Sequence, residues 1–118
     1  MADVTLYHNP NCSTSRHALD EVTAAGVDAD VVQYLKAPLS AEELLDLIDM
    51  LEDPPADLVR KDKFFEEQGL VEGDYQDPQA VAELLDQHPR LMQRPVIVKD
   101  GKAIIGRPKD RVADFLAG

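Results

Sequence analysis

Apolar and polar positions in the first third of the chain follow the period of a strand, then of a helix, then of a strand. Residues 4–7 are apolar, β-branched or aromatic and lead into turn-forming residues, which predicts a strand followed by a loop. Apolar residues then recur at helical spacing, with Ser13 or Thr14 available as the N-cap and Gly26 available to end the helix. Residues 31–34 predict a second strand, so the segment forms a β-α-β unit with a right-handed crossover.

The middle of the chain has mainly helical patterns. Ser40 and Glu43 have the spacing of a capping box, and an apolar stripe at helical spacing follows them until Pro54 and Pro55 end the helix. The second proline also favours a short helix of its own. A further helix is predicted over 77–86, whereas the segment between these helices carries no clear pattern.

The final third returns to strand patterns. The apolar runs 95–98 and 103–105 flank Asp100 and Gly101, and Asp-Gly between apolar runs is a strong hairpin signal. Pro108 opens a last helix with apolar residues on its inward face. The end of the chain therefore predicts a β-β-α unit.

Together these elements predict an α/β fold with one central sheet. The order is β-α-β, a helical insertion at about residues 40–90, and β-β-α, which gives a four-stranded mixed sheet with helices on its faces. Neither a repeat nor a low-complexity linker divides the sequence, so we expect one domain over residues 1–118.

The composition restricts the partners of this fold. The chain of 118 residues has 12 Lys+Arg against 23 Asp+Glu, a formal charge of −11, which argues against nucleic acid and anionic membranes as partners. No run approaches the roughly 18 apolar residues of a membrane span, and no basic leader precedes the first strand. We therefore expect a cytoplasmic protein. The single Cys12, which cannot form an internal disulfide, fits such a reducing compartment.

The charge is unevenly distributed along the chain. Residues 1–41 have 5 acidic and 2 basic residues, residues 42–86 have 15 and 3, and residues 87–118 have 3 and 7, so the net charges are −3, −12 and +4. A bound anion would therefore be held mainly by the last third. The middle has one basic cluster, formed by Arg60, Lys61 and Lys63. Its position favours the solvated end of a helix over a second arm of an anion site.

Cys12 is the first candidate for chemistry. It lies just after the first predicted strand and just before the first helix, where unpaired backbone N–H groups and the helix dipole favour a negatively charged sulfur. A lone cysteine is more often a small buried apolar residue, but the polar, turn-forming neighbours of Cys12 make a poor core environment. We therefore expect Cys12 to be a thiolate.

Two neighbours could act on this sulfur. His8 as an imidazolium ion would lower the thiol pKa further, whereas as a neutral ring it would hold a hydrogen bond in the loop. The hydroxyl of Ser15, three residues after Cys12, could donate to the sulfur or cap the helix. Because Ser15 stands where a Cys-x-x-Cys motif has its second thiol, no partner within the chain can resolve a disulfide at Cys12.

Spacing excludes two other kinds of site. A phosphatase loop needs arginine at the sixth position after its cysteine, where this chain has Ala18, so Arg16 is expected on the helix surface. His17 is expected on the same surface, and His88 in a helix-ending loop before Pro89. Scattered histidines and one cysteine lack the spacing of a zinc or iron site, so we predict no metal.

Four motifs stand out in combination: His8-Asn9-Pro10-Asn11-Cys12-Ser13-Thr14-Ser15-Arg16, Arg60, Arg94-Pro95-Val96-Ile97-Val98 and Gly106-Arg107-Pro108. Together they resemble the glutaredoxin-coupled arsenate reductase family (ArsC-like), which has a thioredoxin-like fold. The similarity extends from about Val4 to Leu116, so the resemblance implies this fold for nearly the whole chain.

The resemblance implies roles for the residues around the cysteine. Cys12 matches the nucleophile that attacks arsenate, His8 a residue that helps to lower the thiol pKa, and Ser15 a residue that hydrogen-bonds the thiolate. Asn9 and Pro10 match positions that shape the loop without chemistry of their own.

The resemblance also implies an oxyanion site made of three arginines, Arg60, Arg94 and Arg107. A planar, permanently charged guanidinium suits a tetrahedral oxyanion, because it holds two oxygens through forked hydrogen bonds. Pro95 matches the structural proline of thioredoxin-like proteins, so we expect a cis peptide bond between Arg94 and Pro95.

The implied reaction is the reduction of arsenate to arsenite, with glutathione as co-substrate and glutaredoxin as protein partner. We expect no bound cofactor and a monomer. Two alternatives remain open, a glutathione-dependent thiol-disulfide oxidoreductase that does not use arsenate and a non-enzymatic regulator of the Spx type. Regulators of that type have a Cys-x-x-Cys switch, whereas this chain has Ser15 at the second position.

Overall fold

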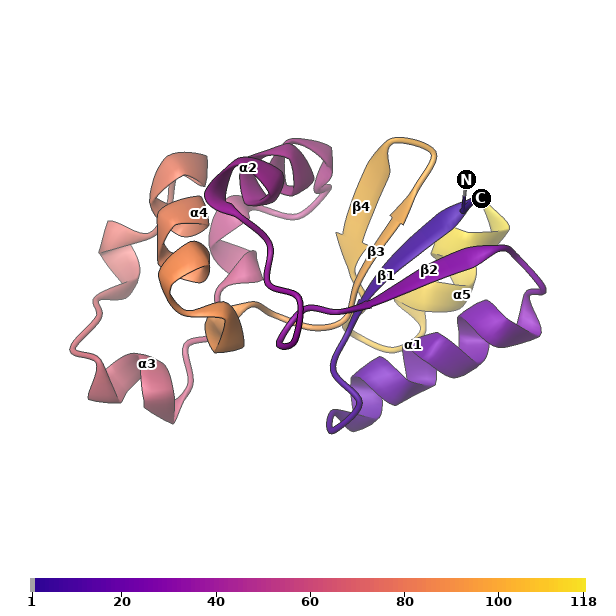
Figure 1. Ribbon diagram of the computed structural model, residues 1–118, viewed down its shortest axis with the longest axis horizontal. Coiled ribbons are helices and arrows are strands. Elements are labelled where there is room, and N and C mark those ends of the chain that lie inside the picture. The colour runs from indigo at the N-terminus through magenta and orange to yellow at the C-terminus, as the bar shows by residue number, and fades with distance from the viewer. Residues whose placement is uncertain (1) are drawn as a thin grey trace.

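The computed structural model describes residues 2–118 and contains a four-stranded mixed sheet (Figure 1). β1 (Val4–His8) pairs in parallel with β2 (Ala29–Gln33) and antiparallel with β3 (Val96–Lys99), which pairs antiparallel with β4 (Lys102–Ile105). The strand order is therefore β2-β1-β3-β4. This sheet confirms the predicted α/β class and its thioredoxin-like arrangement of strands.

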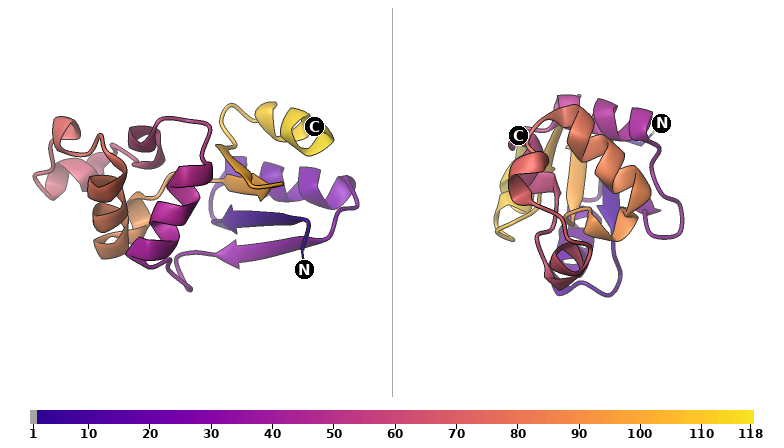
Figure 2. Two further views of the ribbon diagram at one scale, coloured as in Figure 1. Left: turned by 90° about the horizontal axis from the view of Figure 1, so that it is seen from above. Right: turned by 90° about the vertical axis from the view of Figure 1, so that its left-hand side faces the viewer.

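Two helices, α1 (Ser13–Ala24) and α5 (Arg111–Ala117), lie on one face of the sheet (Figure 1, Figure 2). Buried apolar side chains of the strands and of both helices form the core between these layers: Val4, Leu6, Ala18, Val22, Ile97, Ile104 and Val112. Leu6 and Ile97 are register partners on the two central strands, and both are fully buried. Packing of α1 on β1 therefore fixes where the loop between them lies, and Cys12 is in that loop.

The segment between β2 and β3 forms a group of short helices beside the sheet, which gives the molecule an elongated shape of 42 × 25 × 24 Å. Its elements are α2 (Ala41–Met50), η1 (Pro55–Leu58), α3 (Lys63–Glu67), η2 (Glu72–Asp74), α4 (Pro78–Gln87) and η3 (Pro89–Leu91). α2 and α4 pack against each other through buried leucines such as Leu47 and Leu85. Ser40 and Glu43 form the predicted capping box at the start of α2.

Some element boundaries differ from the predicted ones. β2 begins at Ala29 instead of residue 31 and leaves Tyr34 outside the strand, because its parallel ladder extends along the full length of β1. The last helix begins at Arg111 instead of Pro108, because these residues first form a turn in which the Arg111 N–H donates to Pro108 O at 3.1 Å. The unassigned segment between the predicted helices contains α3 and η2.

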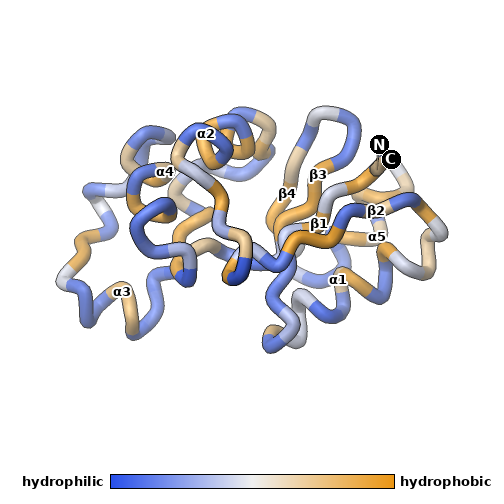
Figure 3. Tube along the Cα trace, viewed as in Figure 1, coloured by the Kyte–Doolittle hydropathy of each residue, from blue (hydrophilic) through white to orange (hydrophobic). Residues whose placement is uncertain are grey.

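Hydropathy follows this layering, with apolar residues concentrated along β3 and β4 and polar residues around α3 (Figure 3). None of the helices within residues 2–118 is long and apolar enough to cross a membrane.

Candidate active site

The loop between β1 and α1 places Cys12 at the start of the helix. The side-chain oxygen of Asn9 accepts a hydrogen bond from the N–H of Asn11 at 3.0 Å, and its backbone oxygen accepts one from the N–H of Cys12 at 3.1 Å. Cys12 is itself the N-cap residue, so the predicted cap at Ser13 or Thr14 is wrong. Its half-buried side chain lies where the N–H groups of the first turn lack helical partners, which is a favourable environment for a thiolate.

His8 and Ser15 hold the base of this loop. Ser15 Oγ lies 2.7 Å from His8 Nδ1 and accepts a hydrogen bond from the backbone N–H of Asn9 at 3.0 Å, and all three residues are buried. The resemblance implies a hydrogen bond from Ser15 to the thiolate, but the Ser15 hydroxyl contacts the His8 ring and the Asn9 backbone instead. Burial lowers the pKa of His8, so the ring is neutral at pH 7 and acts by fixing the loop.

The pKa of the Cys12 thiol results from opposing effects. Burial raises it, but hydrogen bonds from the backbone N–H of Ser15 and the Arg94 guanidinium, together with the N–H of Thr14 and the charge of Arg107, outweigh burial. The pKa of Cys12 is therefore lower than that of an ordinary thiol, which favours the predicted thiolate. Ser15 contributes through its backbone, since its hydroxyl is engaged within the loop.

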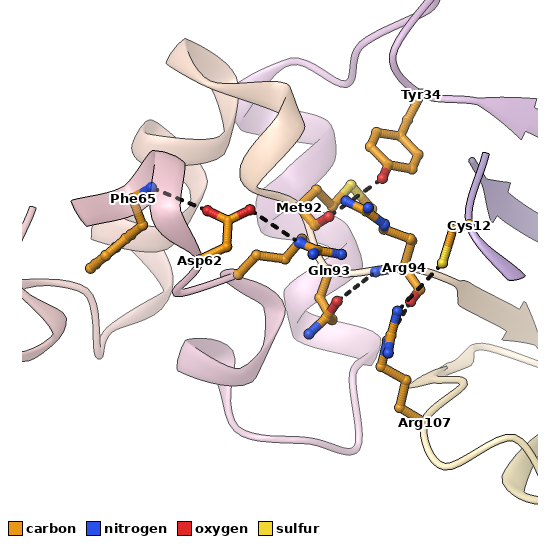
Figure 4. A network of polar contacts seen from close by, with 9 residues as sticks. Cys12, Tyr34, Asp62, Phe65, Met92, Gln93, Arg94 and Arg107 are labelled. Carbon is orange, nitrogen blue, oxygen red and sulfur yellow. Dashed lines mark hydrogen bonds and ion pairs between the residues drawn. The ribbon is translucent and has the colours of Figure 1, made fainter. Parts of the chain in front are cut away.

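Arg107 lies beside the sulfur, and the Arg94 side chain extends from the same region toward Tyr34, as Figure 4 shows. Arg107 Nη2 donates to Cys12 Sγ at 3.4 Å, and its Nε donates to the backbone oxygen of Arg94 at 2.8 Å. The Arg94 Nε is buried and has no hydrogen-bond partner among the described residues. The peptide bond between Arg94 and Pro95 is cis, as the resemblance implies, and the bond between Arg107 and Pro108 is cis as well.

Gly106 brings the backbone of Arg107 close to the start of β3. Its N–H donates to Pro95 O at 2.8 Å, and a Cβ atom at this position would lie only 2.8 Å from Pro95 Cγ and 3.1 Å from Val112 Cγ2. A larger residue would therefore push the Arg107 loop away from Pro95.

Arg60 reaches the same region from the helical segment. A short antiparallel contact joins it to the chain preceding β3: the Arg60 N–H donates to Leu91 O, and the Gln93 N–H donates to Leu58 O, both at 2.7 Å. The expected solvated helix end is wrong for Arg60, because the residue lies in an extended segment that this contact holds beside Arg107.

Arg60 and Arg107 border a shallow pocket of about 230 Å³. Its lining consists of Arg60, Lys61, Asp62, Gln93 and Arg107. The Arg60 Nε, like that of Arg94, is buried without a hydrogen-bond partner in the described chain; Asp62 Oδ2 lies 3.5 Å away but is not aligned to accept. Arg60, Lys61 and Arg107 place three positive charges around this pocket, which favours an anion there.

Comparison with known proteins identifies the family. The family model of the ArsC family matches residues 7–115. The chain belongs to the ArsC family. It is 38% identical to an arsenate reductase of Escherichia coli over 117 residues, which cover 98% of this chain and 82% of that protein. It is also 37% identical to the uncharacterized protein YfgD of Escherichia coli K12 over 115 residues, 96% of either chain.

Solved structures of ArsC-family proteins have the same fold. The arsenate reductase from Vibrio cholerae superimposes with a TM-score of 0.83 at 34% sequence identity, covering 96% of this chain and 97% of that one. The resemblance drawn from the sequence motifs is therefore confirmed at the level of family and fold.

Two further residues of this ArsC-family chain belong to the site although no motif pointed to them. Tyr34 is only 1% exposed, and its hydroxyl donates to Met92 O at 3.4 Å. Burial raises the pKa of Tyr34 against the lowering effect of the Arg94 charge, so the phenol stays protonated. Gln93 Oε1 accepts the Arg94 N–H at 3.2 Å. Tyr34 had one usable signal, since it follows a strand that ends beside the Cys12 loop, whereas Gln93 had none.

The remaining histidines lie apart from this chemistry. Within residues 2–118, no group of three or more His, Cys, Asp or Glu side chains could hold a metal ion. His17 lies on α1 with Glu21 at 3.7 Å, and the ring of His88 packs edge-on against Phe64 with 5.6 Å between the ring centroids.

Proposed function

We propose that this ArsC-family protein reduces arsenate to arsenite, with the Cys12 thiolate as nucleophile and glutathione and glutaredoxin as external reductants. One observation carries the proposal. Arg107 contacts both the sulfur and the pocket beside Arg60, and the buried Nε atoms of Arg60 and Arg94 lack acceptors. The relatives named arsenate reductase support arsenate as the anion that would fill this place.

The arginines make the first step feasible. Arsenate is an oxyanion, so its approach to a thiolate brings negative charges together. The guanidinium groups of Arg60, Arg94 and Arg107 offset this repulsion and can donate forked hydrogen bonds to the arsenate oxygens. The Cys12 sulfur then attacks arsenic, a sulfur–arsenic bond forms, and one oxygen leaves as water after protonation.

The electron balance requires external thiols. Arsenate takes up two electrons on becoming arsenite, which corresponds to the oxidation of two thiols to one disulfide. Cys12 is the only cysteine of the chain and returns to the thiolate in each cycle, so both electrons come from other molecules. Glutathione adds to the sulfur–arsenic adduct with loss of a second water, so that arsenic is bound to both sulfurs. A glutaredoxin thiolate then attacks the glutathione sulfur, the bond from that sulfur to arsenic breaks, and its electron pair reduces arsenic by two electrons. Water displaces arsenite from Cys12, and a second glutathione reduces the glutaredoxin–glutathione disulfide.

A glutathione-dependent thiol-disulfide oxidoreductase that does not use arsenate is the second candidate. The relative YfgD, which is as similar to this chain as the arsenate reductase, carries no activity in its name. Guanidinium groups would also bind the carboxylates of a glutathione moiety. In this case the Cys12 thiolate attacks a mixed disulfide directly.

A direct comparison of substrates separates the two functions. With glutathione, glutaredoxin and glutathione reductase coupled to NADPH oxidation, we expect arsenate-dependent turnover that falls to background in Cys12→Ser. A small mixed disulfide of glutathione is the competing substrate. Glutaredoxin is left out of this second assay, because glutaredoxin reduces such disulfides without the help of another protein. Turnover of the disulfide without turnover of arsenate would assign the second function, and full arsenate activity of Cys12→Ser would exclude Cys12 as the nucleophile.

A further inference from the structure

An ion pair outside the described site ties the helical segment to the loop that carries Arg107. Asp53 lies between α2 and η1, and Arg111 is the first residue of α5. Arg111 Nη1 donates to Asp53 Oδ1 at 3.0 Å, and the two side chains are 32% and 17% exposed, respectively. A partly exposed pair of this kind contributes little to stability by itself, so its geometry is the informative feature.

Asp53 is anchored on the edge strand β4. The N–H of Glu52 donates to Ala103 O at 2.9 Å, and Asp53 Oδ2 accepts the N–H of Ile105 at 3.0 Å. The carboxylate thus occupies a fixed place where β4 ends and the chain turns toward Arg107.

Arg111 holds both ends of that turn. Its Nη1 lies 2.9 Å from Ile105 O and 3.3 Å from Arg107 O, in addition to its bond with Asp53. Asp53 fixes the orientation of the Arg111 guanidinium through a charge-assisted hydrogen bond, and the guanidinium in turn holds the backbone of Arg107.

The Arg107 side chain connects this held backbone to the sulfur of Cys12. Its Nε bonds to Arg94 O, and its Nη2 contacts Cys12 Sγ at 3.4 Å. We propose that Asp53 and Arg111 are positioning residues that hold the Arg107 guanidinium against the Cys12 thiolate. This proposal rests on the proposed function only in taking arsenate as the substrate. The contact between Arg107 and the Cys12 sulfur does not depend on which substrate binds.

Asp53→Ala separates positioning from simple charge, because the two effects on the pKa of Cys12 have opposite signs. Removal of a nearby carboxylate by itself lowers the pKa of a thiol, whereas release of the Arg107 guanidinium raises it. We expect the pH profile of iodoacetamide alkylation to shift upward in Asp53→Ala, with a rate about threefold lower on its acidic limb. Cys12 is the only thiol, so the rate reports on this site alone.

Asp57→Ala is the matched control, because Asp57 is an exposed carboxylate that lines the same groove as Asp53 and Arg111. Its profile should stay in place or shift to lower pH. The double variant of Asp53→Ala and Arg107→Ala should show no further upward shift beyond Arg107→Ala, since Asp53 acts through Arg107. A profile of Asp53→Ala that is unchanged or shifted downward, or a further upward shift in the double variant, would overturn the proposal.

A second variant covers a failure to fold. If circular dichroism shows that Asp53→Ala is unfolded, Asp53→Asn keeps the side-chain shape and one acceptor, and a smaller upward shift is expected; no shift would again overturn the proposal. Alkylation uses no arsenate, so an upward shift in a protein without arsenate turnover would refute the proposed function and leave the positioning role intact.

Discussion

At the scale of single residues, the pKa of the half-buried Cys12 thiol is set by opposing effects of its surroundings. Burial works against its thiolate, and backbone N–H groups of α1 with the guanidinium groups of Arg94 and Arg107 outweigh it. His8 is neutral and acts on the loop through Ser15. The lowered pKa of Cys12 predicts that alkylation of this thiol starts at lower pH than alkylation of an ordinary cysteine.

Arg94→Ala should weaken arsenate binding and slow the attack of the sulfur. The variant loses a guanidinium group that lowers the pKa of the Cys12 thiol and whose buried Nε has no acceptor within the described residues. Hydrogen bonds from such a group to a bound anion contribute about 1.5–3 kcal/mol. We expect kcat/KM for arsenate to fall roughly 10- to 100-fold in steady-state assays. Arg90→Ala is the control, because Arg90 stacks over the Phe64 ring at 4.0 Å instead of facing the sulfur. Unchanged kinetics of Arg94→Ala would contradict its role in oxyanion binding.

Residue types and spacing singled out Cys12, and the resemblance to arsenate reductases added the three arginines, but neither gave the directions of all side chains. The Ser15 hydroxyl is directed at His8 because the turn around Asn9 brings that ring within 2.7 Å, and a turn of this geometry is not encoded in spacing alone. Tyr34 enters the site through burial beside Met92, which is distant in sequence.

At the scale of elements, strong local signals account for the correctly predicted parts. The β3–β4 hairpin has its turn at Asp100 and Gly101, both with positive φ, as an Asp-Gly hairpin requires. The segment around α3 was not predicted, because this helix has only five residues and no repeated apolar spacing. Its one local signal is the N-cap Asp62, whose side chain accepts the Phe65 N–H at 3.1 Å. The position of Arg60 likewise depends on a contact with a distant segment, which no local pattern shows.

Leu47→Ala tests the packing of α2 on α4. Leu47 is fully buried between these helices, so the variant should lower the free energy of unfolding by about 2–5 kcal/mol, measured by urea denaturation. The same substitution at Leu35, which is 45% exposed, serves as the control and should cost much less. Equal stabilities of the two variants would show that this packing does not support the helical segment.

At the scale of the whole molecule, the candidate site lies where the sheet and the helical segment meet. The sheet side supplies Cys12, Arg94 and Arg107, and the helical segment supplies Arg60. A chain with a net charge of −11 repels large polyanions, yet these clustered guanidinium groups can accept a small oxyanion. The order of elements predicted the sheet. The position of the helical segment beside the sheet, which brings Arg60 to the site, follows from tertiary contacts that the order of elements does not show.

The central claim is that arsenate is reduced at Cys12 with electrons from external thiols. Its most direct test is arsenate-dependent NADPH consumption with glutathione and glutathione reductase, measured with and without glutaredoxin and corrected for the reaction without the protein. We expect consumption that requires both arsenate and glutaredoxin and yields one arsenite for each NADPH oxidised. No arsenate-dependent consumption in the complete mixture, from protein whose Cys12 is alkylated readily at neutral pH, would contradict the account.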